Sequence, residues 1–432
     1  MGIKAWRWSV ARGSRAKASV VSDSTRSFDV VVVGAGIAGC TAARFYGERG
    51  LRVALVDGRT EIDDYKRMCT HFIQPSATPV IERLGLAALI EDAGGIRNSL
   101  AAWTRWGWIR VPESQGGEPS AYGYSIRRQT LDPMLRKLAA DTPGVELMLG
   151  RTAVQLLRDG RRFVGVLVKD TDGEVEALSA SLVAAADGRG SRLGELSGVR
   201  ARTMANERFT YFAYYRGLAQ SSGEMGQMWL LEPSTAVAYP NDAGVSVVSC
   251  FVERDRLGDF KRDPEGSFGR FVDALPDGPN IHEAERVSPL LGKLEMPNSS
   301  RRAAVPGLAF IGDAAMASDP LWANGCGRAF QSAAWLVDAT AEALVSNHGL
   351  DRALRRYRRK HRGELLAFYL QSSHFSTARG LLPHERLLIS SAARDPITAR
   401  RVTAFVEGLI GVGELLSPRS VGRVLRIALT AQ

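Results

Sequence analysis

The stretch Phe28-Asp29-Val30-Val31-Val32-Val33-Gly34-Ala35-Gly36-Ile37-Ala38-Gly39 decides the fold of this chain. Its first half is a β-branched apolar run as long as a buried strand, and a G-x-G-x-x-G turn follows it without a gap. Gly34 permits the tight turn, Gly36 lets a pyrophosphate approach the backbone, and Gly39 allows the next helix to pack closely on the strand. The phosphates of a dinucleotide would then meet the positive end of this helix.

A second strand with an acidic end follows this helix. Gly50 can cap the helix, and Arg52-Val53-Ala54-Leu55-Val56 then leads to Asp57. Asp57 stands close to the offset, roughly 20 residues, at which a carboxylate reaches a ribose hydroxyl. The 432 residues contain no second glycine fingerprint of this kind. One nucleotide-binding unit in so long a chain favours a tightly held FAD over a diffusible nicotinamide dinucleotide.

The composition is that of an ordinary globular protein, with 45% hydrophobic and 24% charged residues. These values exclude a disordered or fibrous chain. Every apolar run is interrupted well before the roughly 18 residues that a membrane-spanning helix needs, so we expect none. The four cysteines lie far apart without a C-x-x-C pair, and the six histidines show no metal-ligand spacing. We therefore expect no disulfide framework, no metal site and a reducing, cytoplasmic location.

The net charge of +10 is concentrated at the two ends of the chain. Residues 1–27 hold six Lys and Arg against Asp23 alone, and residues 351–432 hold 15 Lys and Arg against 6 Asp and Glu, so the middle is net negative. We therefore expect no nucleic-acid partner. The first 27 residues read as a disordered tail or, alternatively, as an organelle transit peptide. The basic run Arg355–Arg362 and the apolar Leu365–Leu370 predict a helix. Its charged face is either simply solvated or a dock for an acidic carrier protein or an anionic membrane surface.

Two later strands end in short turns that contain Gly and Asp. The strand Ser181–Ala186 runs into Asp187-Gly188, and the strand Gly307–Ile311 runs into Gly312-Asp313. Together with the glycine turn, and in this order, they resemble the motifs of the FAD-dependent monooxygenase superfamily of para-hydroxybenzoate hydroxylase type. That superfamily also contains geranylgeranyl reductases, squalene epoxidases and flavin-dependent halogenases.

The resemblance implies an α/β fold: a Rossmann-like FAD-binding domain of glutathione-reductase type, interleaved with a mixed β-sheet substrate domain and followed by a helical C-terminal region. The expected boundaries are a tail at 1–27, the FAD-binding domain at 28–200 with substrate-side insertions at about 95–125, the substrate domain at 201–300, the rest of the FAD-binding domain at 301–348, and the basic helical region at 349–432. The segment Trp106-Gly107-Trp108-Ile109-Arg110-Val111 is expected as an edge or pocket-lining strand.

The same resemblance assigns the residues that would hold FAD. Glycines of the turn would bind the pyrophosphate, Asp57 the adenosine ribose, Arg128 the phosphates and ribose, and Asp313 the ribityl chain or pyrophosphate. The helix that begins near Gly325 would direct its positive end at the reduced, anionic flavin. The full set of expected cofactor-binding residues is Gly34, Gly36, Ala38, Gly39, Asp57, Arg67, Arg128, Asp187, Gly312, Asp313, Pro320, Gly325 and Gly327. The expected substrate pocket contains Tyr211, Tyr214, Met228 and Trp322.

The reaction favoured by the resemblance is an NADPH- or NADH-dependent monooxygenation, a hydroxylation or epoxidation through a flavin C4a-hydroperoxide. The substrate would be an apolar or aromatic small molecule, free or on an acidic carrier protein. Two departures from the family pattern leave alternatives open: Met316 stands where hydroxylases commonly have His, and four residues separate Pro320 from Gly325, as in halogenases and some epoxidases. The alternatives are a reductase of isoprenoid double bonds, a halogenase, and a flavin-binding partner protein without turnover. No catalytic acid or base is assigned.

Overall fold

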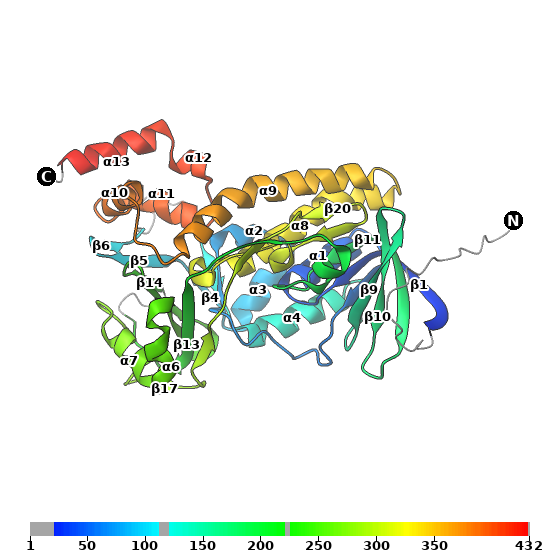
Figure 1. The fold of residues 1–432 in the computed structure, drawn as a ribbon, viewed down its shortest axis with the longest axis horizontal. Helices are drawn as coiled ribbons and strands as arrows, with labels where there is room; N and C mark the ends of the chain where they lie inside the picture. Colours follow the sequence, from blue (N-terminus) through cyan, green and yellow to red (C-terminus); the bar gives the residue numbers. More distant parts are fainter. Residues whose placement is uncertain (1–20, 112–120, 221–224, 431–432) are drawn as a thin grey trace.

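A computed structural model describes residues 21–111, 121–220 and 225–430 of the chain (Figure 1). Its first sheet has the strand order β20-β21-β11-β1-β2-β8, and neighbours from β21 to β8 run parallel. The strands are β1 (Val21–Val33), β2 (Val53–Val56), β8 (Val145–Met148), β11 (Val175–Ala185), β20 (Ala304–Val305) and β21 (Leu308–Phe310), with the antiparallel β9 (Thr152–Asp159) and β10 (Arg162–Lys169) extending from β11. The order confirms the expected Rossmann-like domain assembled from two distant parts of the sequence.

Four helices form the layer that buries this sheet. The helix α1 (Ile37–Gly47) follows the glycine turn and packs against α4 (Arg128–Ala140) and α8 (Asn324–Val345). The long α9 (Leu350–Phe375) packs on α8 and runs along the upper edge of the molecule in Figure 1. Ten of the eleven residues of α1 are buried, which explains why small residues dominate its sequence.

The substrate domain is built on a second sheet with the order β17-β13-β16-β15-β14-β5-β6. Its strands are β5 (Leu100–Thr104), β6 (Gly107–Ile109), β13 (Arg208–Arg216), β14 (Gly226–Leu230), β15 (Thr235–Pro240), β16 (Val245–Glu253) and β17 (Glu285–Arg286), with β18 (Leu291–Lys293) paired to β13. The pairing of β5 with β14 brings the early insertion into this sheet, and β6 lies at its edge, as the Trp-rich segment predicts. Part of the insertion, residues 112–120, lies outside the described residues.

The two faces of this sheet have different neighbours. One face packs against α6 (Leu257–Arg262) and α7 (Pro264–Asp273), which cover residues such as Phe209 and Cys250. The other face, with Phe212 and Phe251, packs toward the first domain and the C-terminal helices. This alternation along the strands sets which side chains can reach a ligand held between the domains.

Smaller elements complete the fold. Helices α2 (Thr78–Arg83), α3 (Leu86–Asp92) and α5 (Arg192–Ser197) flank the first domain, together with two three-stranded sheets, β3 (Phe72–Ile73), β7 (Gly123–Ser125) and β4 (Ile96–Asn98), and β12 (Arg202–Met204), β19 (Asn298–Ser300) and β22 (Met316–Ala317). The chain ends in α10 (Pro383–Ala392), α11 (Pro396–Val406), α12 (Val412–Leu415) and α13 (Pro418–Thr430). Among the described residues, no helix is long and apolar enough to cross a membrane.

The first strand begins earlier than the sequence analysis expects. The expected tail spans residues 1–27, but β1 starts at Val21 and pairs with β11 through Thr25, Arg26 and Ser27. The guanidinium of Arg26 forms ion pairs with Glu146 and Glu176, which neutralise its charge at the sheet. A polar stretch therefore continues the strand because β11 is long enough to pair with it. Residues 1–20 lie outside the described residues.

A buried carboxyl in the C-terminal helices makes stability depend on pH. Burial raises the pKa of Glu407, at the end of α11, to about 8. Because this value lies above the usual one of 4.5, the folded state holds a proton that the unfolded chain releases, and stability falls as pH rises from the lower value to the higher. We expect the free energy of unfolding to fall by about 2 kcal/mol between pH 6 and pH 8 from this group alone.

Replacing Glu407 by Gln should remove most of this pH dependence and leave the variant more stable than the natural chain at pH 8. Denaturant unfolding at the two pH values measures it. The matched control is Glu414→Gln, because Glu414 is exposed near the same helices. A pH dependence unchanged in Glu407→Gln would show that this carboxyl is ionised in the folded protein.

Candidate functional site

A cavity of about 800 Å³ opens at the carboxyl ends of four parallel strands, β1, β2, β11 and β21. The residues that follow these strands line it directly: Gly34 after β1, Asp57 after β2, Asp187 after β11 and Asp313 after β21. Ligands of open parallel sheets bind at this end of the strands. Across the cavity lie the substrate-domain sheet and the start of α8, which contribute Thr210, Phe212, Ser249, Phe251, Lys293, Gly325, Cys326 and Arg328.

The glycine turn fits a pyrophosphate. A Cβ at Gly34, where φ is +108°, would lie 2.4 Å from the oxygen of Ala186, and a Cβ at Gly39 would lie 1.7 Å from the oxygen of Gly34. These two positions are closed by the protein's own backbone. A Cβ at Gly36, by contrast, would meet no atom within 4 Å, and Gly36 lines the cavity. The open space at the start of α1 is therefore where phosphates can approach backbone amides.

Asp57, which follows the neighbouring strand β2, stabilises the glycine turn through hydrogen bonds. Its Oδ2 accepts a hydrogen bond from the amide of Ala35 at 2.6 Å, and Arg59 donates to both carboxylate oxygens at 2.9–3.1 Å. On the other side, the fully buried Arg136 donates from Nε to the oxygen of Ala35 at 3.2 Å. Sequence analysis missed Arg136, because a buried arginine inside a helix has no local signature.

Most of the expected cofactor-binding residues lie in the cavity wall. They are Gly34, Gly36, Ala38, Asp57, Arg128, Asp187, Gly312, Asp313, Pro320 and Gly325. Gly39 lies behind the turn as a packing position, and Gly327 packs against Gln74 and Ala77 rather than lining the cavity. The individual binding roles of these residues stay predictions.

Arg67 is exposed and does not line the cavity; its carbonyl oxygen accepts a hydrogen bond from the hydroxyl of Tyr214 at 3.2 Å. The preceding residue, Lys66, lines the cavity instead, and its Nζ lies 3.9 Å from Oδ2 of Asp313. The sequence contains both cations side by side, and only the path of the loop decides which one faces the ligand.

Two buried arginines lie at the cavity. Arg128 pairs with Asp132 through Nε and Oδ1 at 2.5 Å, one turn along α4. Arg328, in the first turns of α8, donates to the hydroxyl of Ser318 at 3.0 Å. Burial lowers the pKa of Arg328 to about 10, an effect that Asp313 opposes, so the guanidinium is charged at neutral pH. A buried cation beside the positive end of α8 favours an anionic ligand group there.

Two cysteines meet in the cavity wall although 257 positions separate them. The sulfur of Cys326, on α8, lies 3.9 Å from that of Cys69, which also accepts a hydrogen bond from the amide of His71 at 3.2 Å. The hydrogen bond from Cys326 lowers the pKa of the Cys69 thiol well below its usual range, and the same bond, with burial, raises the pKa of Cys326 well above it. Of the two, Cys69 is the more acidic thiol, and Cys326 is the one that keeps its proton to higher pH.

The expected substrate residues do not lie together. Tyr211 stacks on Phe260 with ring centroids 5.5 Å apart, on the face of the sheet turned away from the cavity, so its placement in the pocket is wrong. Residues 210 and 212 of the same strand face the cavity, and residue 211 must point the other way. Tyr214 shares the inner face and donates to the oxygen of Cys69 at 2.8 Å, but it does not line the cavity.

Met228 and Trp322 line a second cavity, of about 100 Å³, between the substrate-domain sheet and the C-terminal helices. Its wall is almost wholly apolar and includes Leu100, Ile109, Leu230, Phe368, Phe375, Leu388, Phe405 and Leu415. The segment Pro320–Ala323 separates the two cavities: Pro320 and Ala323 line the first, and Trp322 lines the second. One hydrophobic cluster contains wall residues of both.

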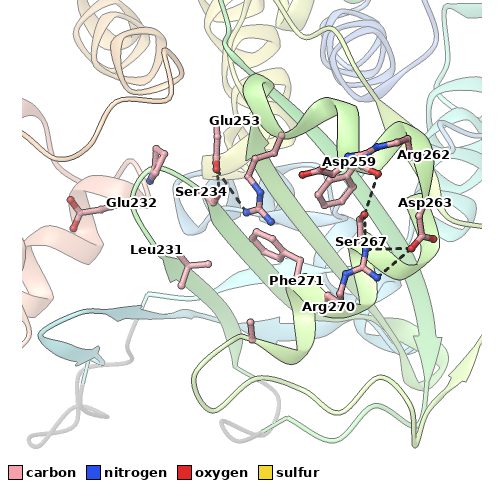
Figure 2. Close-up of a pocket in the computed structure, with 14 residues that line it drawn as sticks. Leu231, Glu232, Ser234, Glu253, Asp259, Arg262, Asp263, Ser267, Arg270 and Phe271 are labelled. Carbon is pink, nitrogen blue, oxygen red and sulfur yellow. Dashed lines mark hydrogen bonds and ion pairs between the residues drawn. The ribbon is translucent and has the colours of Figure 1, made fainter.

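A third pocket, of about 730 Å³, lies on the outer face of the substrate-domain sheet (Figure 2). Its charged side chains already have partners: Arg270 donates to Asp263 and Ser267 at 3.2–3.3 Å, Arg262 pairs with Asp259 at 2.5 Å, and Glu232 pairs with Arg105 outside the pocket. The sheet separates this pocket from the main cavity, and we assign it no part in the site.

Known proteins resemble this chain over most of its length. A family profile described as "FAD binding domain" matches residues 27–263. A digeranylgeranylglycerophospholipid reductase from Picrophilus torridus is 24% identical over 370 residues, which are 84% of this chain and 89% of that protein. Two solved structures share the fold: a flavin-dependent brominase (TM-score 0.77, 18% identity, 94% and 100% covered), and a geranylgeranyl bacteriochlorophyll reductase-like protein from Thermoplasma acidophilum (TM-score 0.67, 18% identity, 94% and 96% covered).

Proposed function

The chain belongs to the family of this FAD-binding domain, and on that premise we propose that it is an FAD-dependent reductase of carbon–carbon double bonds in isoprenoid chains. The observation that carries the proposal is an apolar wall shared by two adjoining cavities: one hydrophobic cluster contributes side chains to both, and the segment Pro320–Ala323 lies between them. A long hydrocarbon chain would remove this wall from water, whereas a small polar substrate would leave it uncovered. The similarity to digeranylgeranylglycerophospholipid reductases supports the same substrate class.

Reduction of a carbon–carbon double bond needs a hydride at one carbon and a proton at the other, and the residues of the cavity suit both requirements. FAD held by the glycine turn and Asp57 would supply, once reduced, a hydride for one carbon of the double bond. The other carbon needs a proton, and the thiol of Cys326, which lines the cavity and whose pKa is raised, would donate it. The sulfur of Cys69, 3.9 Å from that of Cys326, positions this thiol. Apolar side chains such as Phe212 and Phe251 keep water from the reacting carbons.

Arg328 and the start of α8 would stabilise the negative charge of the reduced flavin. We expect Arg328→Met to lower the two-electron reduction potential by about 30 mV, which corresponds to about 1.4 kcal/mol. Arg328→Lys keeps the charge and should restore most of the difference. Equilibrium titration against a dye of known potential measures both variants. An unchanged potential in Arg328→Met would place the flavin ring away from this guanidinium.

Product analysis tests the proposed reaction. The FAD-loaded protein is given a geranylgeranyl-bearing lipid, with NADPH, NADH or dithionite as reductant, with and without oxygen. We expect products heavier by two hydrogens per reduced double bond, formed without oxygen. A product that gains one oxygen atom, formed only when oxygen is present, would overturn the proposal in favour of the monooxygenase, and a halide requirement would favour the halogenase. Flavin that stays oxidised with every reductant would favour the partner protein without turnover.

The monooxygenase is the second candidate. Three aromatic side chains, Phe72, Phe212 and Phe251, line the main cavity on the substrate side and would suit a flat aromatic substrate equally well. The product analysis distinguishes the reductase from the monooxygenase because only the monooxygenase consumes oxygen. For either enzyme, that NADPH or NADH reduces the flavin is a prediction.

A further inference from the structure

The C-terminal helices expose an unusual number of large apolar side chains. Six of those exposed in the described residues fall within positions 397–429: Ile397, Leu409, Leu416, Val421, Leu425 and Leu429. Exposed apolar side chains scattered singly need no explanation, but a concentration at one end of a molecule marks a surface that meets a partner or a membrane.

The helix α13 arranges three of them in one row. Val421, Leu425 and Leu429 are spaced by four residues, lie on one face, and are 42%, 49% and 77% exposed. The adjoining side of the helix, with Ser420 and Val424, is buried where α13 packs on α10 and α11. The row itself is exposed to solvent, and nothing in the described part of the chain covers it.

Basic residues accompany this row. On α13 itself Arg419 and Arg426 are exposed beside it. On α9, Arg355, Arg359 and Arg362 are exposed and form no ion pair with any residue that the structure describes. The other side of α9 packs on α8, and Figure 1 shows α9 and α13 along the same upper edge of the molecule.

This combination suits one partner best. A second copy of the chain would bring two basic surfaces together and be repelled. An acidic carrier protein would match the arginines but leave a row that ends in the 77% exposed Leu429 in water. A helix with an apolar face and flanking arginines is typical of segments that lie in the interface of an anionic membrane.

We propose that α13 and the exposed arginines of α9 dock this protein peripherally on an anionic phospholipid surface. The row Val421, Leu425 and Leu429 enters the acyl boundary, and the arginines lie against the headgroups. The helices beneath α13, α10 and α11, form part of the wall of the second cavity. A membrane lipid would therefore reach that cavity from the docked side, a step that rests on the proposed function, whereas the docking does not.

Vesicle co-sedimentation of the full-length, FAD-loaded protein tests the docking without any substrate. We expect at least tenfold tighter binding to vesicles of phosphatidylglycerol and phosphatidylcholine than to phosphatidylcholine alone, with binding that weakens as salt is added. Leu425→Asp combined with Leu429→Asp should weaken binding at least tenfold. The matched control is Leu89→Asp, because Leu89 is also exposed, on α3 in another part of the molecule. Retained flavin in each variant shows that it is folded.

A second variant tests the docking independently, in case the two aspartates unfold α13. Replacing Arg355 and Arg359 by Glu should abolish the preference for anionic vesicles while leaving the apolar row intact. Equal binding to both vesicle types, or unchanged binding in both sets of variants, would overturn the proposal. A change of oligomeric state in the aspartate variant, with vesicle binding unchanged, would overturn it too, because the row would then be a subunit contact. None of these outcomes depends on the reaction that the enzyme catalyses.

Discussion

Replacing Gly36 by leucine is expected to give a folded protein that no longer binds FAD. The backbone at Gly36 has φ of −91°, which any residue adopts, and a Cβ there meets no protein atom within 4 Å. The new side chain would instead occupy the space at the start of α1 where we expect the pyrophosphate to bind. Because the phosphates would lose their backbone donors, we expect FAD affinity to fall at least 100-fold, about 2.7 kcal/mol.

Two controls separate lost binding from lost folding. Gly258→Leu adds the same side chain at an exposed glycine on α6, where a Cβ also meets no atom within 4 Å, and should bind FAD with unchanged affinity. Gly39→Leu places a Cβ 1.7 Å from a backbone oxygen and should prevent folding. Equilibrium titration with FAD, beside circular dichroism, measures all three. Normal FAD affinity in Gly36→Leu would place the pyrophosphate elsewhere.

Replacing Cys326 by alanine is expected to slow reduction of the double bond about 100-fold while leaving reduction of the flavin itself unchanged. The thiol is the proposed proton donor, and a positioned acid contributes about this much. The flavin is reduced by a different partner and does not need this proton. Rapid mixing of the variant with each reactant in turn measures the two steps separately.

Cys250→Ala is the matched control for this prediction. Cys250 is buried, and burial raises its pKa to about 12, but it packs on the outer face of the substrate-domain sheet. Its loss should therefore change neither step. If Cys326→Ala reduces the double bond at the natural rate, the proton comes from another group, and the role proposed for the cysteine pair is wrong.

The FAD-binding domain could be predicted from sequence because its signals are local. The strand, turn, helix, strand and acid from Phe28 to Asp57 follow one another without a gap, and the turns at Asp187 and Gly312 each end a recognisable buried strand. Parallel strands bring these ends to one edge of the sheet, so the cavity wall follows from the motifs. The superfamily resemblance and the fold class are confirmed on this basis.

The rest of the site depends on contacts between distant parts of the chain. Cys69 and Cys326 meet across 257 positions, and Arg136 and Arg328 are buried although arginine usually lies at the surface. The misplacement of Tyr211 was avoidable, since residues 211 and 214 of one strand cannot share a face. The second cavity could not be predicted from the sequence. Its wall combines the strands β5, β6 and β14 with C-terminal helices that lie more than 130 positions further along the chain.

A single-turnover experiment without oxygen tests the central claim most directly. The protein-bound FAD is reduced, excess reductant is removed, and a geranylgeranyl-bearing lipid is added while the flavin absorbance is followed. We predict that the flavin is reoxidised in step with the loss of one double bond per FAD, and that a saturated lipid of the same length has no effect. A flavin that stays reduced until oxygen is admitted, whichever lipid is present, would contradict the proposal that this enzyme reduces isoprenoid double bonds.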